Sequence, residues 1–268
     1  MPDTTYTHGH DDGVLRSHRW RTAANSAAYL LPRLRTGLDL LDVGCGPGTI
    51  TCDLAEAVAP GRVVGVDASA EVVAEARTVA AGRSLPVTFD VADLFALPFD
   101  DASFDVVHAH QVLQHVADPV AALAEMRRVC RPGGVVAARD ADYRSFAFAP
   151  EEPDLSRAIA AYGELTRINR ANWDGARHLL GWAHAAGFED VTASASVWCF
   201  ATDEDRAWWG GLWADRFAAP GSFLGEQLEL HGIADRADLE AFGSGWRRWA
   251  ASPDGWFAVL HGEILAVP

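Results

Sequence analysis

The sequence predicts an α/β fold in which a doubly wound, mostly parallel sheet is covered by helices and carries helical inserts. Short apolar runs of strand length alternate with helical segments between residues 38 and 139. This alternation is typical of parallel sheets that are buried on both faces. The chain has 268 residues, of which 49 % are hydrophobic, and this is enough for one large α/β domain.

The elements of this first part follow one another at the spacing of βαβ units. Right-handed crossovers between parallel strands place helices on both faces of the sheet. The predicted strands lie at 38–43, 63–66, 87–89, 104–110 and 135–139, and the predicted helices lie at 49–59, 71–80 and 119–129.

The regular pattern breaks after Asp140. We expect an irregular-to-helical insert at 140–176, then a helix at 177–186 and a strand at 191–200. A tryptophan-rich helical stretch at 203–251 precedes a last strand at 256–266. We interpret residues 1–268 as one domain, made of an N-terminal arm with a lid helix near 21–31 (1–35), a cofactor-binding core (36–139) and substrate-side inserts (140–176 and 203–254).

Composition excludes several functional classes. The formal net charge of −15 argues against nucleic acid or an anionic membrane surface as a partner, because both need clustered cations. All 22 basic residues are arginines, so neither a Schiff-base lysine nor a Walker lysine is available. The four cysteines form no CxxC pair, which predicts no metal site. Without an apolar leader or spanning segment, we expect a cytoplasmic protein, and the alanine- and arginine-rich composition suggests a bacterial source.

A glycine-rich turn is the strongest single feature. The segment 40–49 reads LLDVGCGPGT, a buried strand that runs through Gly44, Gly46 and Gly48 into a helix. Such a turn allows a ligand to approach the backbone closely. The GxGxG spacing differs from the dinucleotide GxGxxG motif, and Asp42 before the glycines favours a cationic ligand over a phosphate.

Two further acidic residues follow at successive strand ends. Asp67 lies 19 residues beyond Gly48, where a carboxylate can accept hydrogen bonds from ribose hydroxyls. Asp93 follows the next strand and could accept a bond from an adenine amino group, with Leu94 beside it. Each residue alone could be a turn or helix-cap residue, but their order along the sheet favours a nucleoside site.

These motifs resemble those of the class I S-adenosylmethionine-dependent methyltransferases, most closely the group around ubiquinone and menaquinone C-methyltransferases. The resemblance rests on LLDVGCGPGT, VVGVDAS, DLFALPFDDASFDVV, HQVLQHVADP and MRRVCRPGG. It implies a seven-stranded sheet with an antiparallel last strand, and S-adenosylmethionine as cofactor. It also implies that His110 faces the methionyl part and that His115 lines the substrate pocket. The candidate cofactor-binding residues are Arg21, Asn25, Asp42, Gly44, Gly46, Gly48, Thr49, Asp67, Ala68, Asp93, Leu94 and His110.

Methyl transfer is an in-line displacement, so the protein mainly has to position the reactants. A general base helps only where the acceptor must lose a proton. We consider His110, His115, Asp142 and Tyr143 as candidate bases, with His110, His115 and Tyr143 as the catalytic set, and we expect His108 to be a core residue. In the N-terminal arm, Arg21 or Asn25 is predicted to reach the methionine carboxylate; the alternative is a solvated helix face.

The substrate is predicted to be a small aromatic or quinone-like molecule. Seven of the ten tryptophans lie from position 198 onward; they could line a pocket for a flat ring or pack a helical insert. Methylation in specialised metabolism, for example at an indole carbon, is one option, and a homodimer is another open possibility. The alternatives are a non-catalytic cofactor-binding sensor or partner protein, and an NAD-linked oxidoreductase, which the loop spacing argues against.

Overall fold

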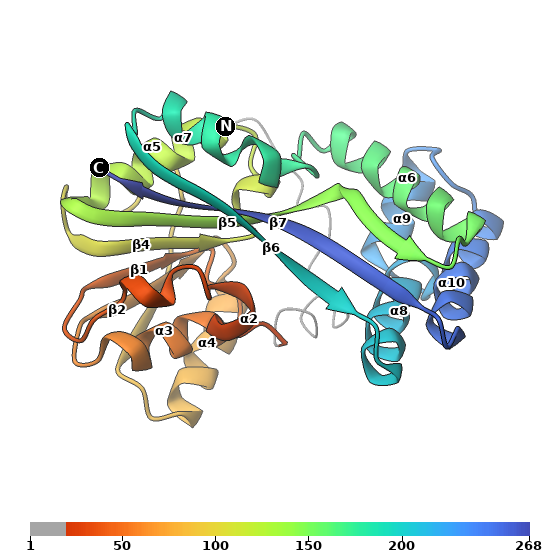
Figure 1. Cartoon of the computed structure of the whole chain (residues 1–268), viewed down its shortest axis with the longest axis horizontal. Helices are drawn as coiled ribbons and strands as arrows, with labels where there is room; N and C mark the ends of the chain where they lie inside the picture. Colours follow the sequence, from red (N-terminus) through yellow and green to blue (C-terminus); the bar gives the residue numbers. More distant parts are fainter. Residues whose placement is uncertain (1–19) are drawn as a thin grey trace.

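The computed structural model describes residues 20–268 and contains a seven-stranded sheet (Figure 1). The strand order is β3-β2-β1-β4-β5-β7-β6. The strands are β1 (Leu40–Val43), β2 (Val63–Asp67), β3 (Val87–Val91), β4 (Phe104–His110), β5 (Cys130–Ala149), β6 (Asp190–Phe200) and β7 (Trp256–Val267).

The sheet is parallel from β3 to β5, and β7 runs antiparallel to both of its neighbours, β5 and β6. The chain moves outward from β1 to β2 and β3 and then returns to place β4 on the other side of β1. The order therefore reverses between β1 and β4, and open α/β sheets bind ligands at such a point. The predicted doubly wound, mostly parallel seven-stranded sheet is confirmed.

Helices of the first half begin at well-formed caps. Ser69 and Asp118 accept hydrogen bonds from backbone amides in the first turns of α4 and α5, and Pro119 stands at the start of α5. The helices are α2 (Ala23–Ser26), α3 (Thr49–Val58), α4 (Ala70–Gly82), α5 (Pro119–Val129), α6 (Pro153–Ile168), α7 (Leu179–Ala185), α8 (Asp203–Ala218), α9 (Phe223–Leu230) and α10 (Arg236–Ala251); short 3₁₀ turns are η1 (Leu31–Arg33), η2 (Leu113–His115) and η3 (Gly175–His178).

The predicted insert at 140–176 is wrong for its first ten residues. Strand β5 continues to Ala149, because its far end pairs again with β7 after an irregularity between Asp142 and Ala147. The hydrophobic pattern of residues 140–149 follows neither the two-residue period of a strand nor the 3.6-residue period of a helix, because this part of the strand lies between two layers of side chains. Helix α6 then begins at Pro153, and the stretch at 203–251 is helical as predicted.

The predicted helix near 21–31 is also wrong in length. Helix α2 is a single turn, opened by a capping box between Thr22 and Asn25. The indole N–H of Trp198 donates to the Asn25 carbonyl at 2.7 Å, and this contact occupies a carbonyl that a longer helix would use for the N–H of Tyr29. Residues 1–19 of the predicted arm lie outside the described part of the chain.

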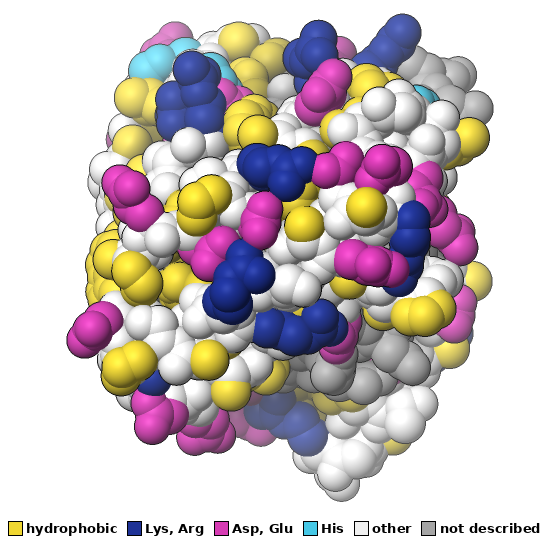
Figure 2. Space-filling view, turned by 90° about the vertical axis from the view of Figure 1, so that its right-hand side faces the viewer, with side chains coloured by type: hydrophobic (Ala, Val, Ile, Leu, Met, Phe, Trp, Pro, Cys, Tyr) yellow, Lys and Arg dark blue, Asp and Glu magenta, His cyan; other side chains and the backbone are white. Residues whose placement is uncertain are grey.

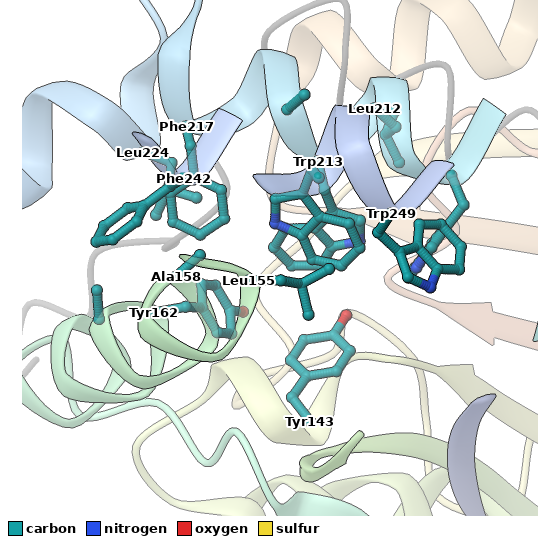
Figure 3. Packing of buried hydrophobic residues seen from close by; sticks show 14 of the residues in the cluster. Tyr143, Leu155, Ala158, Tyr162, Leu212, Trp213, Phe217, Leu224, Phe242 and Trp249 are labelled. Carbon is teal, nitrogen blue, oxygen red and sulfur yellow. The ribbon is translucent and has the colours of Figure 1, made fainter. Parts of the chain in front are cut away.

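Long strands carry a separate helical lobe at one end of the molecule. In Figure 1, β5, β6 and β7 extend beyond the first half of the sheet and reach the group formed by α6, α8, α9 and α10. A cluster of buried aromatic residues fills this lobe. Figure 3 shows Trp213 and Trp249 from the lobe standing opposite Tyr143 of β5. The rings of Trp213 and Trp246 stack with their centroids 5.5 Å apart.

The outer surface of the lobe has mixed charge. Figure 2 shows arginine side chains interspersed with acidic ones on this face. Arg248 pairs with Glu152 and Asp154, and Arg157 pairs with Asp238, so two arginines join α6 and its N-terminal cap to α10. Within residues 20–268, no helix has both the length and the apolar character that a membrane crossing needs.

Replacing Trp246 by alanine is expected to destabilise the protein by about 3–5 kcal/mol, because the side chain is fully buried and a large cavity would remain. Denaturant unfolding measures the loss. The matched control is Leu230→Ala, because this leucine is 73 % exposed and its loss should change stability by less than about 0.5 kcal/mol. Equal effects of the two changes would refute the assignment of Trp246 to the core.

Candidate active site

A cavity of about 280 Å³ opens at the carboxyl ends of β1, β2 and β4, over the reversal of strand order. One end is formed by the glycine loop and the start of α3, together with Asp67, Ala68 and Leu94. The aromatic end is formed by Trp20, Trp198, Trp208, Trp209 and Tyr143. The cavity lining further includes Arg21, His110, Gln111, His115, Val116 and Arg216.

The glycine loop has a backbone that only glycine adopts easily. Gly44, Gly46 and Gly48 have φ angles of +65°, +56° and +79°. A Cβ on Gly44 would lie 2.4 Å from a methyl of Val112. Gly44, Gly46 and Thr49 lie on the cavity wall. Gly48 is absent from the described wall; it caps α3 and packs against Phe89.

Asp42 anchors the loop from below. Its side chain is buried, and its two oxygens accept hydrogen bonds from the Nδ1–H of His108 at 2.7 Å and from the Thr51 hydroxyl. His108 is fully buried in β4, in agreement with the expected core position, and it also serves this carboxylate. Because Asp42 lies on the cavity wall, a negative charge stands at the cofactor end.

Asp67 ends β2 and supports the loop from the side. It accepts one backbone N–H from Gly46 at 3.1 Å and another from Ser69 at 3.0 Å. The carboxylate is therefore fixed at the wall, and each oxygen keeps a lone pair for a ligand hydroxyl. The adjacent Cys45 thiol is not a nucleophile, because burial and the nearby carboxylates raise its pKa far above the usual value.

Three other predicted residues do not form part of the described wall as expected. Asp93 accepts the backbone N–H of Phe95, while its neighbours Ala92 and Leu94 line the cavity. The Asn25 side chain closes the capping box of α2. Asp142 is buried and accepts two hydrogen bonds from Arg177, so the geometry does not support it as a base.

His110 presents an imidazole to the cavity. The side chain is 94 % buried, and neither ring nitrogen has a hydrogen-bond partner among the described residues. Burial, followed by the charges of Arg139 and Arg21, lowers its pKa well below the usual value. The ring is therefore neutral at physiological pH and has one donor and one acceptor nitrogen. Such a ring is expected to be satisfied by a ligand.

His115 has its tautomer set by Gln114. The Gln114 Oε1 accepts the backbone N–H of Ala141 at 2.8 Å, so its amide nitrogen faces the His115 Nε2 at 3.0 Å and must donate to it. The His115 proton then resides on Nδ1. Burial and the charge of Arg21 lower the pKa of His115 to about 3. This arrangement favours hydrogen-bond donation over proton abstraction.

A buried polar layer behind the cavity was not anticipated. Arg139 of β5 donates to Glu263 of β7 at 3.2 Å and to Ser196 of β6 at 3.0 Å, and its guanidinium stacks over the Trp198 ring. Burial lowers the pKa of Arg139 to about 10. In the sequence, Arg139 and Glu263 each stand as a charged residue inside an apolar strand. They become partners only through the pairing of β5 with β7.

Some tryptophans line the cavity, and others pack the core of the helical lobe. Trp198, Trp208 and Trp209 line the cavity, as does Trp20, which lies 5.1 Å from both Trp198 and Trp208 between ring centroids. The other large group, with Trp213, Trp246 and Trp249, fills the core of the lobe.

The sheet order, its antiparallel β7 and a cavity over the point of strand reversal define the class I methyltransferase fold. A methyltransferase domain model matches residues 41–138. An uncharacterized methyltransferase of Schizosaccharomyces pombe is 34 % identical over 97 % of this chain and 95 % of its own length. The ubiquinone/menaquinone biosynthesis C-methyltransferase of Bdellovibrio bacteriovorus is 40 % identical over 38 % of this chain and 43 % of its own length. The Bacillus subtilis protein YcgJ shares the fold, with a TM-score of 0.59, 19 % identity and coverage of 90 % of this chain and 96 % of that one.

The chain therefore belongs to the methyltransferase family, and it is an S-adenosylmethionine-dependent methyltransferase. The resemblance read from its motifs is confirmed. Its bacterial source, cytoplasmic location and possible homodimer stay predictions.

The histidines give the protein a pH-dependent stability. His115 has a lowered pKa in the native state. The contribution of the neutral ring to the free energy of unfolding is therefore complete above about pH 6.5 and is lost as the pH falls toward 3. Between about pH 6 and pH 5, the unfolding free energy of the wild type should fall by about 1 kcal/mol more than that of His115→Gln. Urea unfolding at each pH measures this difference. Above about pH 8 the two proteins should have equal slopes, and parallel curves throughout would disprove the lowered pKa.

Proposed function

We propose that the enzyme methylates a small planar aromatic or quinone-like molecule bound at the aromatic end of the cavity. The observation that carries the proposal is the lining of that end by Trp20, Trp198, Trp208, Trp209 and Tyr143. Flat aromatic walls bind flat ligands through large contact areas at low entropic cost. Indole carbon methylation in specialised metabolism is one instance of this class and a first candidate to test.

The described residues fit the cofactor at the other end. Gly44 and Gly46 bring backbone close to a ligand, Asp67 offers fixed acceptors for ribose hydroxyls, and Ala68 and Leu94 flank the adenine region. Asp42 favours a cation. When bound, S-adenosylmethionine supplies an electrophilic methyl group on a sulfonium. Arg21 is proposed for the methionine carboxylate, and Asp93 for the adenine amino group.

The side chains between the two ends position the acceptor. A neutral His110 can accept a hydrogen bond or a proton from an O–H or N–H acceptor. His115 donates from Nδ1, and the Tyr143 hydroxyl provides a further polar group in the same wall. Alignment of the acceptor with the methyl group and exclusion of water can together account for about 7–11 kcal/mol of the barrier.

Incubation of the protein with S-adenosylmethionine labelled in its methyl group and a panel of indoles, phenols and quinols tests the substrate class. A labelled, protein-dependent small-molecule product supports the proposal. Tight cofactor binding without any labelled product from the panel or from a cell extract would contradict the proposed substrate class.

Trp208→Ala is expected to raise the KM for the aromatic acceptor about tenfold or more, while the cofactor affinity changes less than about twofold. The reason is that the Trp208 ring forms part of the aromatic end, where stacking of a flat ligand on an aromatic side chain contributes on the order of 1–3 kcal/mol to the binding free energy. Steady-state kinetics and calorimetry measure the two quantities. Trp256→Ala is the matched control, since Trp256 is half-exposed and lies away from the described cavity wall. A similar KM for both variants would count against an aromatic acceptor site.

A further inference from the structure

We infer that Gln111 and His261 are positioning residues that hold the Arg21 guanidinium at the cavity. Three consecutive contacts support this. Arg21 donates to the Gln111 Oε1 at 2.8 Å, the Gln111 Nε2 lies 2.9 Å from the His261 Nε2, and the His261 Nδ1 lies 3.1 Å from the Val259 carbonyl. We call this chain of contacts the Arg21 relay.

The donors and acceptors of the relay allow one assignment. Because Arg21 can only donate, the Gln111 oxygen must face it, and the Gln111 amide nitrogen must then face His261. That nitrogen also only donates, so the His261 Nε2 accepts and the His261 proton resides on Nδ1. From Nδ1 it is donated to the Val259 carbonyl. Each of the three contacts in the relay therefore pairs a donor with an acceptor.

The far end of the relay is rigid. His261 is fully buried on β7, which lies between β5 and β6. Its ring packs against Trp198 at 4.2 Å and stacks on His110 at 6.4 Å, measured between ring centroids. Burial and the charge of Arg139 lower the pKa of His261 well below the usual value. The ring therefore stays neutral and keeps its acceptor.

The middle of the relay is held in a backbone conformation that residues other than glycine rarely adopt. Gln111 has a φ of +53°, and its N–H donates to the Arg139 carbonyl at 2.7 Å. This conformation follows directly after β4 and turns the Gln111 side chain toward β7. Observed strain of this kind is concentrated at functional sites.

Arg21 lies outside regular secondary structure. It precedes the single-turn helix α2 and lies before the Thr22 cap. An ordered guanidinium binds a carboxylate better than a mobile one, because less side-chain entropy is lost on binding. This inference rests on the proposed role of Arg21 with the methionine carboxylate, and it adds that β7, far away in sequence, sets the position of that charge.

The test compares two ligands, one with and one without the carboxylate that Arg21 is proposed to bind. S-adenosylhomocysteine carries the amino-acid carboxylate, whereas 5′-methylthioadenosine lacks the amino-acid part. Calorimetry on the full chain gives both affinities for the wild type, Arg21→Ala, His261→Leu and His261→Gln. Leucine removes the acceptor that Gln111 needs, and glutamine can place an oxygen near the position of the imidazole Nε2.

We expect Arg21→Ala to weaken S-adenosylhomocysteine binding by about 10- to 100-fold. His261→Leu should weaken it by about three- to tenfold, and His261→Gln should recover most of that loss. Binding of 5′-methylthioadenosine should change less than about twofold in all three. In the Arg21→Ala background, His261→Leu should have no further effect, because both changes act through one group.

Equal losses for His261→Leu and His261→Gln, or a parallel loss of 5′-methylthioadenosine binding, would overturn the relay. If His261→Leu does not fold, Gln111→Met breaks the relay at its centre and carries the same expectation. The proposed function fails separately: a wild-type protein that binds S-adenosylhomocysteine but methylates no aromatic acceptor contradicts the substrate class and leaves the relay standing.

Discussion

The buried carboxylate of Asp42 is the contact on which the site depends. It lies on β1, accepts a hydrogen bond from His108 of β4 and another from Thr51 of α3, and so joins the three elements that surround the glycine loop. A buried charge is tolerated only where its lone pairs are satisfied. His108 and Thr51 supply these hydrogen bonds to Asp42. The glycine loop that follows Asp42 is thereby held in place at the point where the strand order reverses.

The second half of the chain adds the acceptor end by extending the sheet. Strands β5, β6 and β7 are long enough to serve both the cavity and the helical lobe, so one set of strands sets the distance between cofactor end and aromatic end. Arg139 of β5 and Glu263 of β7 are paired in register, and two serines of β6, Ser194 and Ser196, donate hydrogen bonds to Glu263. Buried ion pairs contribute little net stability but penalise other arrangements, which suits a layer that aligns the two ends.

The cofactor half could be predicted from the sequence because its signals are local. Strand, turn and helix follow within ten residues around Gly44, and the strand at 104–110 and the helix at 119–129 have the predicted bounds. The acceptor half could not, since its contacts join distant segments. Gln111 meets His261 across 150 residues, and Trp198 meets Asn25 across 173. The extension of β5 to Ala149 depends likewise on pairing with β7, and no periodicity within the segment expresses it.

The cavity brings charges of both signs close to two neutral rings. Asp42 and Asp67 line it together with Arg21 and Arg216, and the rings of His110 and His115 lie in the same wall. Burial is the main cause that lowers the pKa of both histidines, and the charge of Arg21 adds to it, because a nearby positive charge disfavours protonation. A neutral histidine can accept a proton, whereas a charged one would repel a sulfonium ligand. Arg21, for which we propose a role at the methionine carboxylate, therefore also helps to keep both histidines uncharged.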